Sequence, residues 1–316
     1  MADAWAEVLD VPAVGIDDNF FELGGDSLSA IKVVSMLRLR INLVDFYTHP
    51  TVRALAEKMI TEKNETGIRV RLTRRKKASG RNVVCFPYGG GSALAYRKLS
   101  NAVQEKDYSL NIYSLNLPGH DYGAQNELMP IKQTAEMLAA EIAENLSGEL
   151  ILYSHCVGCA LMLATVDLLE KACVPVKAVF IGGVMLPRFI RLYGRFINPW
   201  MFYTDKRIIR YLKKIGLPKD LADDKEYAEV MISAFRHDSG GFTSYIYSLL
   251  GSEAKKREMP TFIVVGGKDI TTKKYSKRYL RWHKFFENIK LIAIENADHY
   301  FIDTHADNIA EYIDSI

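Results

Sequence analysis

The chain has 316 residues, enough for about two domains of roughly 150 residues each. With 48% hydrophobic and 25% charged residues and a net charge of +3, the composition excludes wholesale disorder and favours neither nucleic acid nor a membrane surface as a partner. No apolar run reaches about 18 residues, so we expect no membrane span, and the acidic first residues do not fit a secretory signal. The four cysteines are scattered, so we expect no disulfide scaffold and a cytoplasmic location.

The first 68 residues contain three amphipathic patterns that predict helices. They lie in "AWAEVL", in "SLSAIKVVSMLRLR" (27–40) and in "TVRALAEKMI" (51–60). Pro50 and Thr51 precede the last pattern and are suited to start a helix. The segment is acidic, with eleven acidic and six basic residues. We therefore expect a small all-α domain over residues 1–66.

The second of these helices begins at the motif "FFELGGDSL". Gly24 and Gly25 permit a tight turn, and Asp26 and Ser27 are both good N-caps, so the local pattern alone makes Ser27 a helix cap. However, "DDNFFELGGDSLSAIK" followed by "FYTHPTVRALAEKM" resembles the peptidyl and acyl carrier domains of nonribosomal peptide synthetases and related megasynthases. The resemblance covers about residues 3–62. It implies a four-helix carrier bundle with 4′-phosphopantetheine attached covalently to Ser27.

The carrier resemblance also implies partners. These are a phosphopantetheinyl transferase and upstream condensation and adenylation modules, and the start at Met1 suggests a piece of a larger synthetase. One departure concerns the junction between "SMLRLR" and "INLVDFYTHP", which is several residues shorter than is usual in the family. Either this loop is short, or residues are missing near 40–41.

A basic segment follows the helical domain. The run "RVRLTRRKKASGR" (69–81) has seven basic residues and no acid. Like-charge runs of this kind usually stay solvated, so we expect a linker over 67–81 that includes a frayed first strand. An alternative is a docking surface for an acidic partner, for instance the N-terminal domain itself.

From residue 82 to residue 316 strand patterns alternate with amphipathic helices such as 131–146 and 157–172. The predicted strands are 82–88, 111–117, 149–155, 177–184, 260–267 and 289–296. This alternation predicts a mainly parallel sheet covered by helices, with any active site at the carboxyl ends of the strands.

The segment "LILYSHCVGCALM" places S-H-C-V-G between a strand and a helix. This is the G-x-S-x-G pattern of a nucleophile elbow, with the small residues Ser154 and Gly158 flanking Cys156 in place of serine. A helix N-terminus favours the thiolate. Two alternatives stay open: Cys156 and Cys159 form a redox C-x-x-C, or Cys156 only packs. No second C-x-x-C accompanies the first, so we expect no metal site.

An acid and a histidine follow in the chain order of the α/β-hydrolases. Asp269 follows the fifth predicted strand in "GGKDITT", and His299 follows the sixth in "NADHYFID". His120 and His155 are competing candidates for the general base. We expect His155, directly before the nucleophile, to point away from it, and His120 to shape the pocket.

Residues 82–316 resemble the thioesterase domains of nonribosomal peptide and polyketide synthesis. The matching segments are "CFPYGGGSALAYRKL", "LNLPGHDYG", the elbow, "GGKDITT" and "DHYFI". They are more similar to the stand-alone editing type, because Gly182 and Gly183 stand where many fused thioesterases carry their acid. The resemblance implies an α/β-hydrolase fold with a helical lid over about 185–250. Its aromatic residues are expected mainly in the lid core: Phe196, Trp200, Phe202 and Tyr203.

The same resemblance implies roles for the site residues. Cys156 is the nucleophile, His299 the general base and acid, and Asp269 the residue that orients His299. The oxyanion would be bound by backbone N–H groups of Val157 and of Gly89 or Gly90.

Cysteine in place of serine bears on how the product leaves. Transfer from pantetheine to Cys156 exchanges one thioester for another, so the acyl group stays activated. We expect release by intramolecular cyclisation or amide formation slightly more than by hydrolysis. The alternatives are an editing enzyme that clears misloaded carriers and a catalytically idle module on which the carrier docks.

Overall fold

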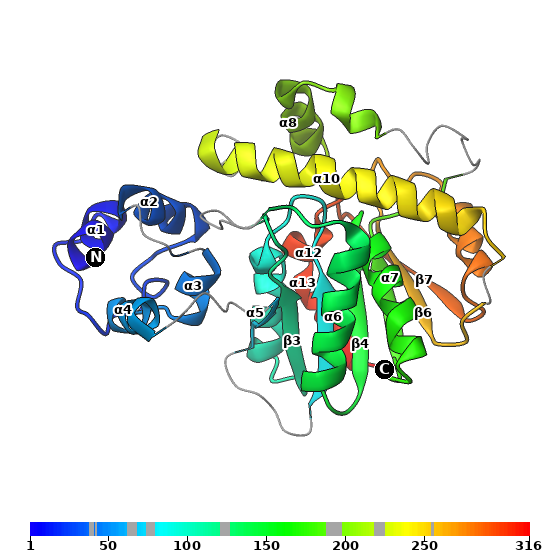
Figure 1. The fold of residues 1–316 in the computed structure, drawn as a ribbon, viewed down its shortest axis with the longest axis horizontal. Helices are drawn as coiled ribbons and strands as arrows, with labels where there is room; N and C mark the ends of the chain where they lie inside the picture. The colour runs from blue at the N-terminus through cyan, green and yellow to red at the C-terminus, as the bar shows by residue number, and fades with distance from the viewer. Residues whose placement is uncertain are drawn as a thin grey trace.

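Buried apolar side chains gather in an N-terminal helical core and in larger cores on the two faces of a β-sheet. The N-terminal helices lie to one side of this sheet (Figure 1). The computed structural model describes residues 1–37, 41, 43–61, 68–73, 80–120, 127–187, 198–217, 225–253 and 256–316. Residues 38–40 and 42 at the shortened junction, the basic residues within 74–79, and Phe196 lie outside the described part. No described helix is both long and apolar enough to cross a membrane.

The N-terminal domain is helical, as predicted. Its described helices are α1 (Ala2–Leu9), α2 (Ser27–Leu37), α3 (Leu43–Thr48) and α4 (Val52–Thr61). They enclose the fully buried rings of Trp5, Phe20 and Phe46, whose centroids lie 4.8 to 5.6 Å apart. Edge-to-face packing of this kind adds to the hydrophobic gain of burial. Helix α3 was not predicted individually, because six residues are too few to show a helical period.

Seven strands form one sheet in the order β1-β3-β2-β4-β5-β6-β7. They are β1 (Arg69–Arg71), β2 (Arg81–Phe86), β3 (Leu110–Leu115), β4 (Leu150–His155), β5 (Ala178–Gly182), β6 (Thr261–Gly266) and β7 (Ile289–Ile294). All neighbouring pairs are parallel except β1 with β3. The mainly parallel sheet predicted from the alternating pattern is confirmed.

Strand β1 lies within residues 67–81, for which we expect a linker that includes a frayed first strand. It pairs antiparallel with β3, with Val70 opposite Ser114. Arg69 forms an ion pair with Glu141 at 3.3 Å, and its guanidinium lies 4.7 Å from the centroid of the Tyr113 ring. Residues 69–71 are therefore the edge strand of the sheet.

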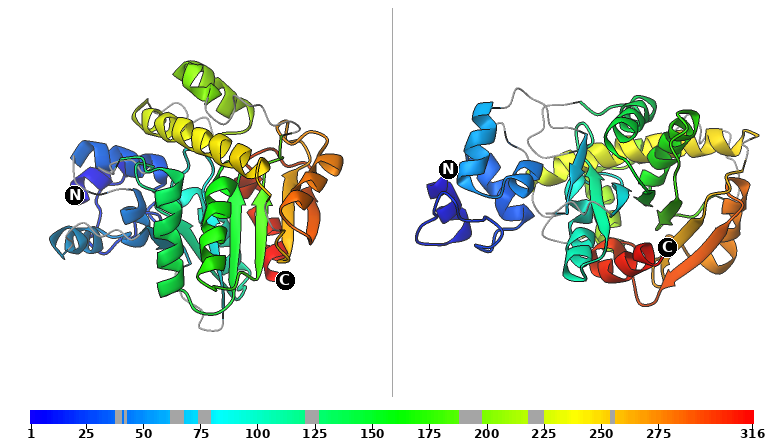
Figure 2. Two further views of the ribbon diagram at one scale, coloured as in Figure 1. Left: turned by 45° about the vertical axis from the view of Figure 1, so that its right-hand side comes forward. Right: turned by 90° about the horizontal axis from the view of Figure 1, so that it is seen from below.

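Helices cover both faces of the sheet, and the two sides are seen in Figure 2. One face carries α6 (Ile131–Asn145) and α7 (Gly158–Lys171), and the other carries α5 (Arg97–Glu105), α12 (Phe301–Thr304) and α13 (Ala306–Asp314). Two further helices, α8 (Asp205–Lys214) and α10 (Lys225–Leu250), lie across the carboxyl ends of the strands (Figure 1). Both belong to the segment predicted as a lid.

Candidate active site

Cys156 lies in the turn between β4 and α7. Its φ of 52° is in the left-handed region, which is unusual for a residue with a side chain and typical of a nucleophile elbow. Its N–H donates to the carbonyl of Gly182 at 2.8 Å. A Cβ at Gly158 would come 2.1 Å from the carbonyl oxygen of Pro87, so only glycine fits there. The turn therefore holds a partly exposed thiol at the start of a helix.

His299 connects Asp269 to the thiol. The Nδ1–H of His299 donates to Oδ2 of Asp269 at 2.9 Å, and Cys156 interacts with the imidazole closely enough to raise its pKa. The other carboxylate oxygen of Asp269 accepts from the N–H and the hydroxyl of Thr271, each at 2.7 Å. The structure thus brings Cys156, His299 and Asp269 together in one connected set.

The electrostatics of this set favour the protonated form of His299 beside the Asp269 carboxylate. Burial lowers the pKa of His299, but the opposing effects of Cys156 and Asp269 are larger and raise it to about 10. Burial raises the pKa of Asp269, yet its bonds with His299 and Thr271 bring the net value below the ordinary one. Asp269 therefore stays ionised, and its charge supports the raised pKa of His299.

The two competing histidines are bonded to other partners. His155 is fully buried, and its Nε2–H donates to the carbonyl of His299 at 2.9 Å. Burial and the charge of His299 lower the pKa of His155 to about 3, so it is neutral and supports the loop that carries His299. His120 instead forms an ion pair with Asp238 at 2.9 Å. The described residues hold no cluster of three or more metal-ligating side chains.

The second cysteine of the C-x-x-C motif lies in the protein interior. Cys159 is a fully buried free thiol of α7, and burial raises its pKa well above the usual range. It packs with the apolar side chains of the sheet and helices. This is the environment of a small core residue, whereas Cys156 is partly exposed.

The predicted oxyanion donors meet beside Cys156. Gly89 lies against Val157, since a Cβ at Gly89 would come 2.8 Å from Cγ2 of Val157. The N–H of Gly90 donates to Oδ2 of Asp238 at 2.9 Å and is therefore engaged. This favours the N–H groups of Gly89 and Val157 as the oxyanion donors. Sequence reasoning missed Asp238, because its partners Gly90 and His120 are more than 100 residues away in the chain.

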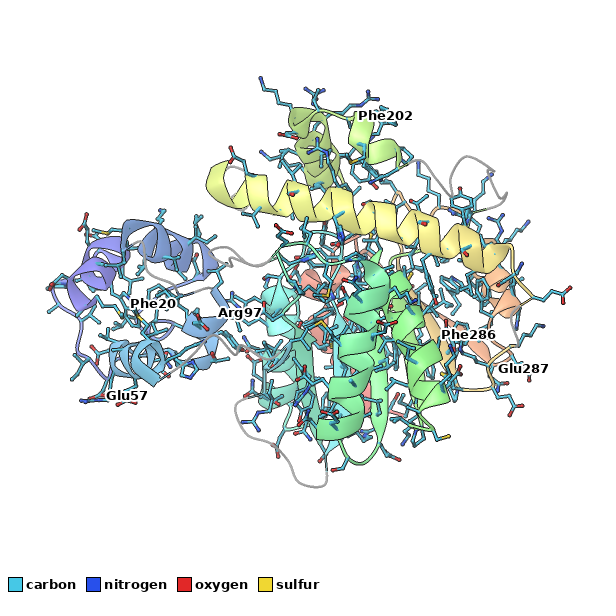
Figure 3. All side chains as sticks on the ribbon, in the orientation of Figure 1. Phe20, Glu57, Arg97, Phe202, Phe286 and Glu287 are labelled. Atoms are coloured by element: carbon cyan, nitrogen blue, oxygen red, sulfur yellow. The ribbon has the colours of Figure 1, made fainter. Side chains whose placement is uncertain are left out.

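A cavity of about 60 Å³ lies above Cys156, room for about two water molecules. Aromatic lid residues line it, including Trp200, whose ring contacts Tyr203, Tyr211 and Phe235 at centroid distances of 4.8 to 5.4 Å. Trp200 and Tyr203 pack, as expected, against the apolar core that α8 and α10 form in the segment predicted as a lid. The prediction for Phe202 is wrong: it is 78% exposed, on the outer side of the short 3-10 helix whose Trp200 packs inward (Figure 3).

In the N-terminal domain, Asp26 caps α2. Its Oδ1 accepts from the N–H of Ser29 at 2.8 Å, and the Ser29 hydroxyl accepts from the N–H of Asp26 at 2.7 Å. Gly24 has φ 95°, and a Cβ at Gly25 would come 2.4 Å from the Phe20 ring. Because Asp26 performs the capping, Ser27 is not needed for it. Ser27 is the first residue of an 11-residue helix, where a phosphodiester is favoured, so the residues present fit a phosphopantetheine.

Two family models match the chain: a phosphopantetheine attachment site over residues 1–59 and a thioesterase domain over residues 81–316. Phenyloxazoline synthase MbtB of Mycobacterium tuberculosis is 24% identical over 279 residues, which cover 74% of this chain and 19% of MbtB. Bacitracin synthase 2 of Bacillus licheniformis is 45% identical over 60 residues, which cover 18% of this chain and 2% of that protein. The chain spans about a fifth or less of the length of these relatives.

Solved structures share the fold. YbtT, a type II thioesterase from the yersiniabactin pathway, aligns with a TM-score of 0.63 at 21% identity, covering 78% of this chain and 96% of YbtT. The type II thioesterase BorB from the borrelidin cluster aligns with a TM-score of 0.64 at 17% identity, covering 80% and 99%. The four-domain nonribosomal peptide synthetase AB3403 covers 99% of this chain at a TM-score of 0.53 and 19% identity, with 25% of its own length aligned. The chain therefore belongs to the thioesterase domain family and bears, ahead of that domain, a carrier domain for covalently bound 4′-phosphopantetheine.

Proposed function

We propose that this chain is a terminal carrier and thioesterase of a nonribosomal peptide or hybrid synthetase. Ser27 bears the phosphopantetheine, whose terminal thiol holds the acyl or peptidyl chain as a thioester. Cys156 then receives the chain and releases it. The observation that carries the proposal is the Cys156–His299–Asp269 set at a nucleophile elbow, in the same polypeptide as a carrier domain.

The chemistry follows from the positions of these groups. His299 accepts the proton of Cys156, and the sulfur attacks the thioester carbonyl. The N–H groups of Gly89 and Val157 stabilise the resulting oxyanion. When the carbon–sulfur bond to the carrier breaks, His299 returns its proton to the departing thiol, and Asp269 keeps the imidazole in orientation.

The second half of the reaction releases the chain from Cys156. His299 accepts a proton from the incoming amine, hydroxyl or water as that group attacks the acyl carbon. The Cys156 sulfur leaves as a thiolate. This leaving group needs no stronger activation than the pantetheine thiol that leaves in the first step. An enzyme thioester keeps enough reactivity for amide formation, so we propose cyclisation or aminolysis ahead of hydrolysis. A product mixture that contains only the free acid would refute this order.

The test is to load Ser27 with an acyl-pantetheine by a phosphopantetheinyl transferase and to follow the loaded chain by mass spectrometry. Transfer within one chain leaves its total mass unchanged, so proteolytic peptides containing Ser27 and Cys156 are measured separately. We expect Cys156→Ala to retain its cargo on Ser27, while the parent and the matched control Cys173→Ala, an exposed free thiol, lose it. Equal release from Cys156→Ala would make the domain a docking module.

Editing of misloaded carriers is the second candidate. It is favoured by the placement of Asp269 after β6 and by the fold shared with type II thioesterases. A Ser27→Ala chain that clears acetyl groups from many separate carriers would support editing. Turnover restricted to its own carrier would support terminal release.

A further inference from the structure

The glycine-rich turn beside Cys156 lies directly under helix α10. A Cβ at Gly89 would come 3.1 Å from the Phe235 ring, and a Cβ at Gly90 would come 2.5 Å from the carbonyl oxygen of Met231. Gly90 also has φ 73°. The glycines thus let the lid helix rest on the turn that contains the expected oxyanion donor.

Asp238 of α10 holds the same turn through a charged hydrogen bond. Its Oδ2 accepts from the N–H of Gly90 at 2.9 Å, and both its oxygens lie 2.9 Å from Nε2 of His120. Nδ1 of His237 donates to Oδ1 at 3.2 Å. Asp238 and His120 have side chains only 17% and 4% exposed. Two segments distant from α10, those of Gly90 and His120, therefore meet at one shielded carboxylate.

The charge state of this pair follows from its hydrogen bonds. Nδ1 of His120 faces the carbonyl of Pro118 at 2.9 Å, and Nε2 faces Asp238, so both ring nitrogens need a proton to donate. Burial lowers the pKa of His120, but Asp238 raises the net value. Burial raises the pKa of Asp238, whereas His120, His237 and Gly90 bring it to about 2. The pair is an imidazolium and a carboxylate.

The Tyr88–Gly91 turn contains three glycines, so contacts with other segments are needed to restrain its conformation. Glycine has the widest conformational freedom and loses the most entropy when it is ordered. A donor contributes to oxyanion stabilisation only when it is held 2.7–3.1 Å, roughly, from the place where the charge develops. A charge-assisted hydrogen bond at Gly90 restrains the peptide that directly follows Gly89.

We propose that Asp238 is a positioning residue that orients the Tyr88–Gly91 turn for oxyanion binding, and that His120 holds Asp238 in place. The inference rests on the proposed function of Cys156. It makes lid helix α10 a structural part of the oxyanion hole. A purely structural role, in which Asp238 only fastens the lid to the domain, is the competing explanation.

The test compares two reactions of Cys156, of which only one forms an oxyanion. Acylation by a soluble acyl-N-acetylcysteamine thioester passes through a tetrahedral oxyanion, whereas alkylation by iodoacetamide does not. For Asp238→Ala we expect acylation to slow by about 10²–10³-fold, mainly in kcat, as when one oxyanion donor is removed. Alkylation should stay within about twofold of the parent, since the Cys156–His299–Asp269 set is intact. Inhibition by an acyl trifluoromethyl ketone, which forms an ionised adduct, should weaken in parallel with acylation.

The variant Asp238→Asn separates an effect on acylation from a folding defect caused by the loss of the side chain. Its amide oxygen can still accept from Gly90, so we expect a smaller loss of acylation than for Asp238→Ala. The matched control is Asp167→Asn on α7, whose carboxylate pairs with Arg257 and Tyr245 and leaves the turn untouched. Unfolding curves of all variants accompany the rates.

Each outcome decides the proposal. If Asp238→Ala acylates like the parent, or loses alkylation to the same extent as acylation, the positioning role is refuted while the function proposed for Cys156 stands. If the parent itself is never acylated on Cys156, the proposed function fails, and the positioning role fails with it.

Discussion

At the scale of single residues, the fold raises the pKa of one histidine of the site and lowers the pKa of its neighbour. His299 and His155 lie side by side with ring centroids 5.3 Å apart. His299 faces two acidic groups and is held protonated, whereas His155 is enclosed by apolar and aromatic neighbours and is held neutral. Two adjacent imidazoles can thus perform different work, one in proton transfer and one as a fixed donor.

The raised pKa of His299 leads to a pH prediction. Its folded value of about 10 lies above the ordinary value of about 6.5, so its pairing stabilises the fold fully below about pH 6.5 and is lost as the pH rises through about 10. In Cys156→Ala the thiol contribution disappears, so the midpoint should fall. NMR titration of the His299 ring measures this. An unchanged midpoint in Cys156→Ala would contradict an interaction of Cys156 with the His299 imidazole.

At the scale of elements, the elbow depends on Gly158 at the start of α7. A Cβ there would lie 2.1 Å from the carbonyl of Pro87, at the end of β2. We expect Gly158→Ala to destabilise the thioesterase domain by about 1–3 kcal/mol or more, as overpacking does in close-packed interiors, and to abolish release. Denaturant unfolding and release assays measure both effects. Gly241→Ala, where the nearest side-chain atom is 3.8 Å away, is the matched control and should stay near the parent.

The sequence predicts most elements and only part of the site. The six parallel strands are predictable because they are largely apolar runs between helices, most of them buried. The elbow, Asp269 and His299 are predictable because each follows a strand. Helix α3 is too short to show a period, whereas a frayed first strand is expected in the basic run and is found as β1, whose pairing with β3 the run does not reveal. Asp238 could not be predicted from local pattern, since its role depends on contacts between distant segments.

At the scale of the whole molecule, the two domains touch through a small surface. Val44 of α3 packs with the core of the α/β domain, and Leu94 packs against the helical core. Arg97, on the side of the α/β domain that faces the helices (Figure 3), lies 5.8 Å from the centroid of the Phe21 ring. A cleft of about 970 Å³ between the domains is lined by residues of both, among them Gly25 and Arg97.

Arg97 also acts electrostatically on the turn before Ser27. Burial raises the pKa of Asp26, but its bonds with Ser29 and the charge of Arg97 lower the net value. We expect Arg97→Glu to slow release of cargo from the chain's own carrier by about two- to fivefold, the range of a partly exposed charge contact. Turnover of a soluble thioester should not change. Lys106→Glu at the exposed end of α5 is the control, and equal slowing in both variants would argue against a docking role for Arg97.

The antiparallel edge strand begins at Arg69, only eight residues after helix α4 ends at Thr61. The carrier domain is thus joined to the sheet within one polypeptide, and cargo on it would be presented to the thioesterase at an effective concentration in roughly the millimolar range. Foreign thioesters at lower concentrations would therefore compete poorly, and the enzyme is expected to act chiefly on its own carrier.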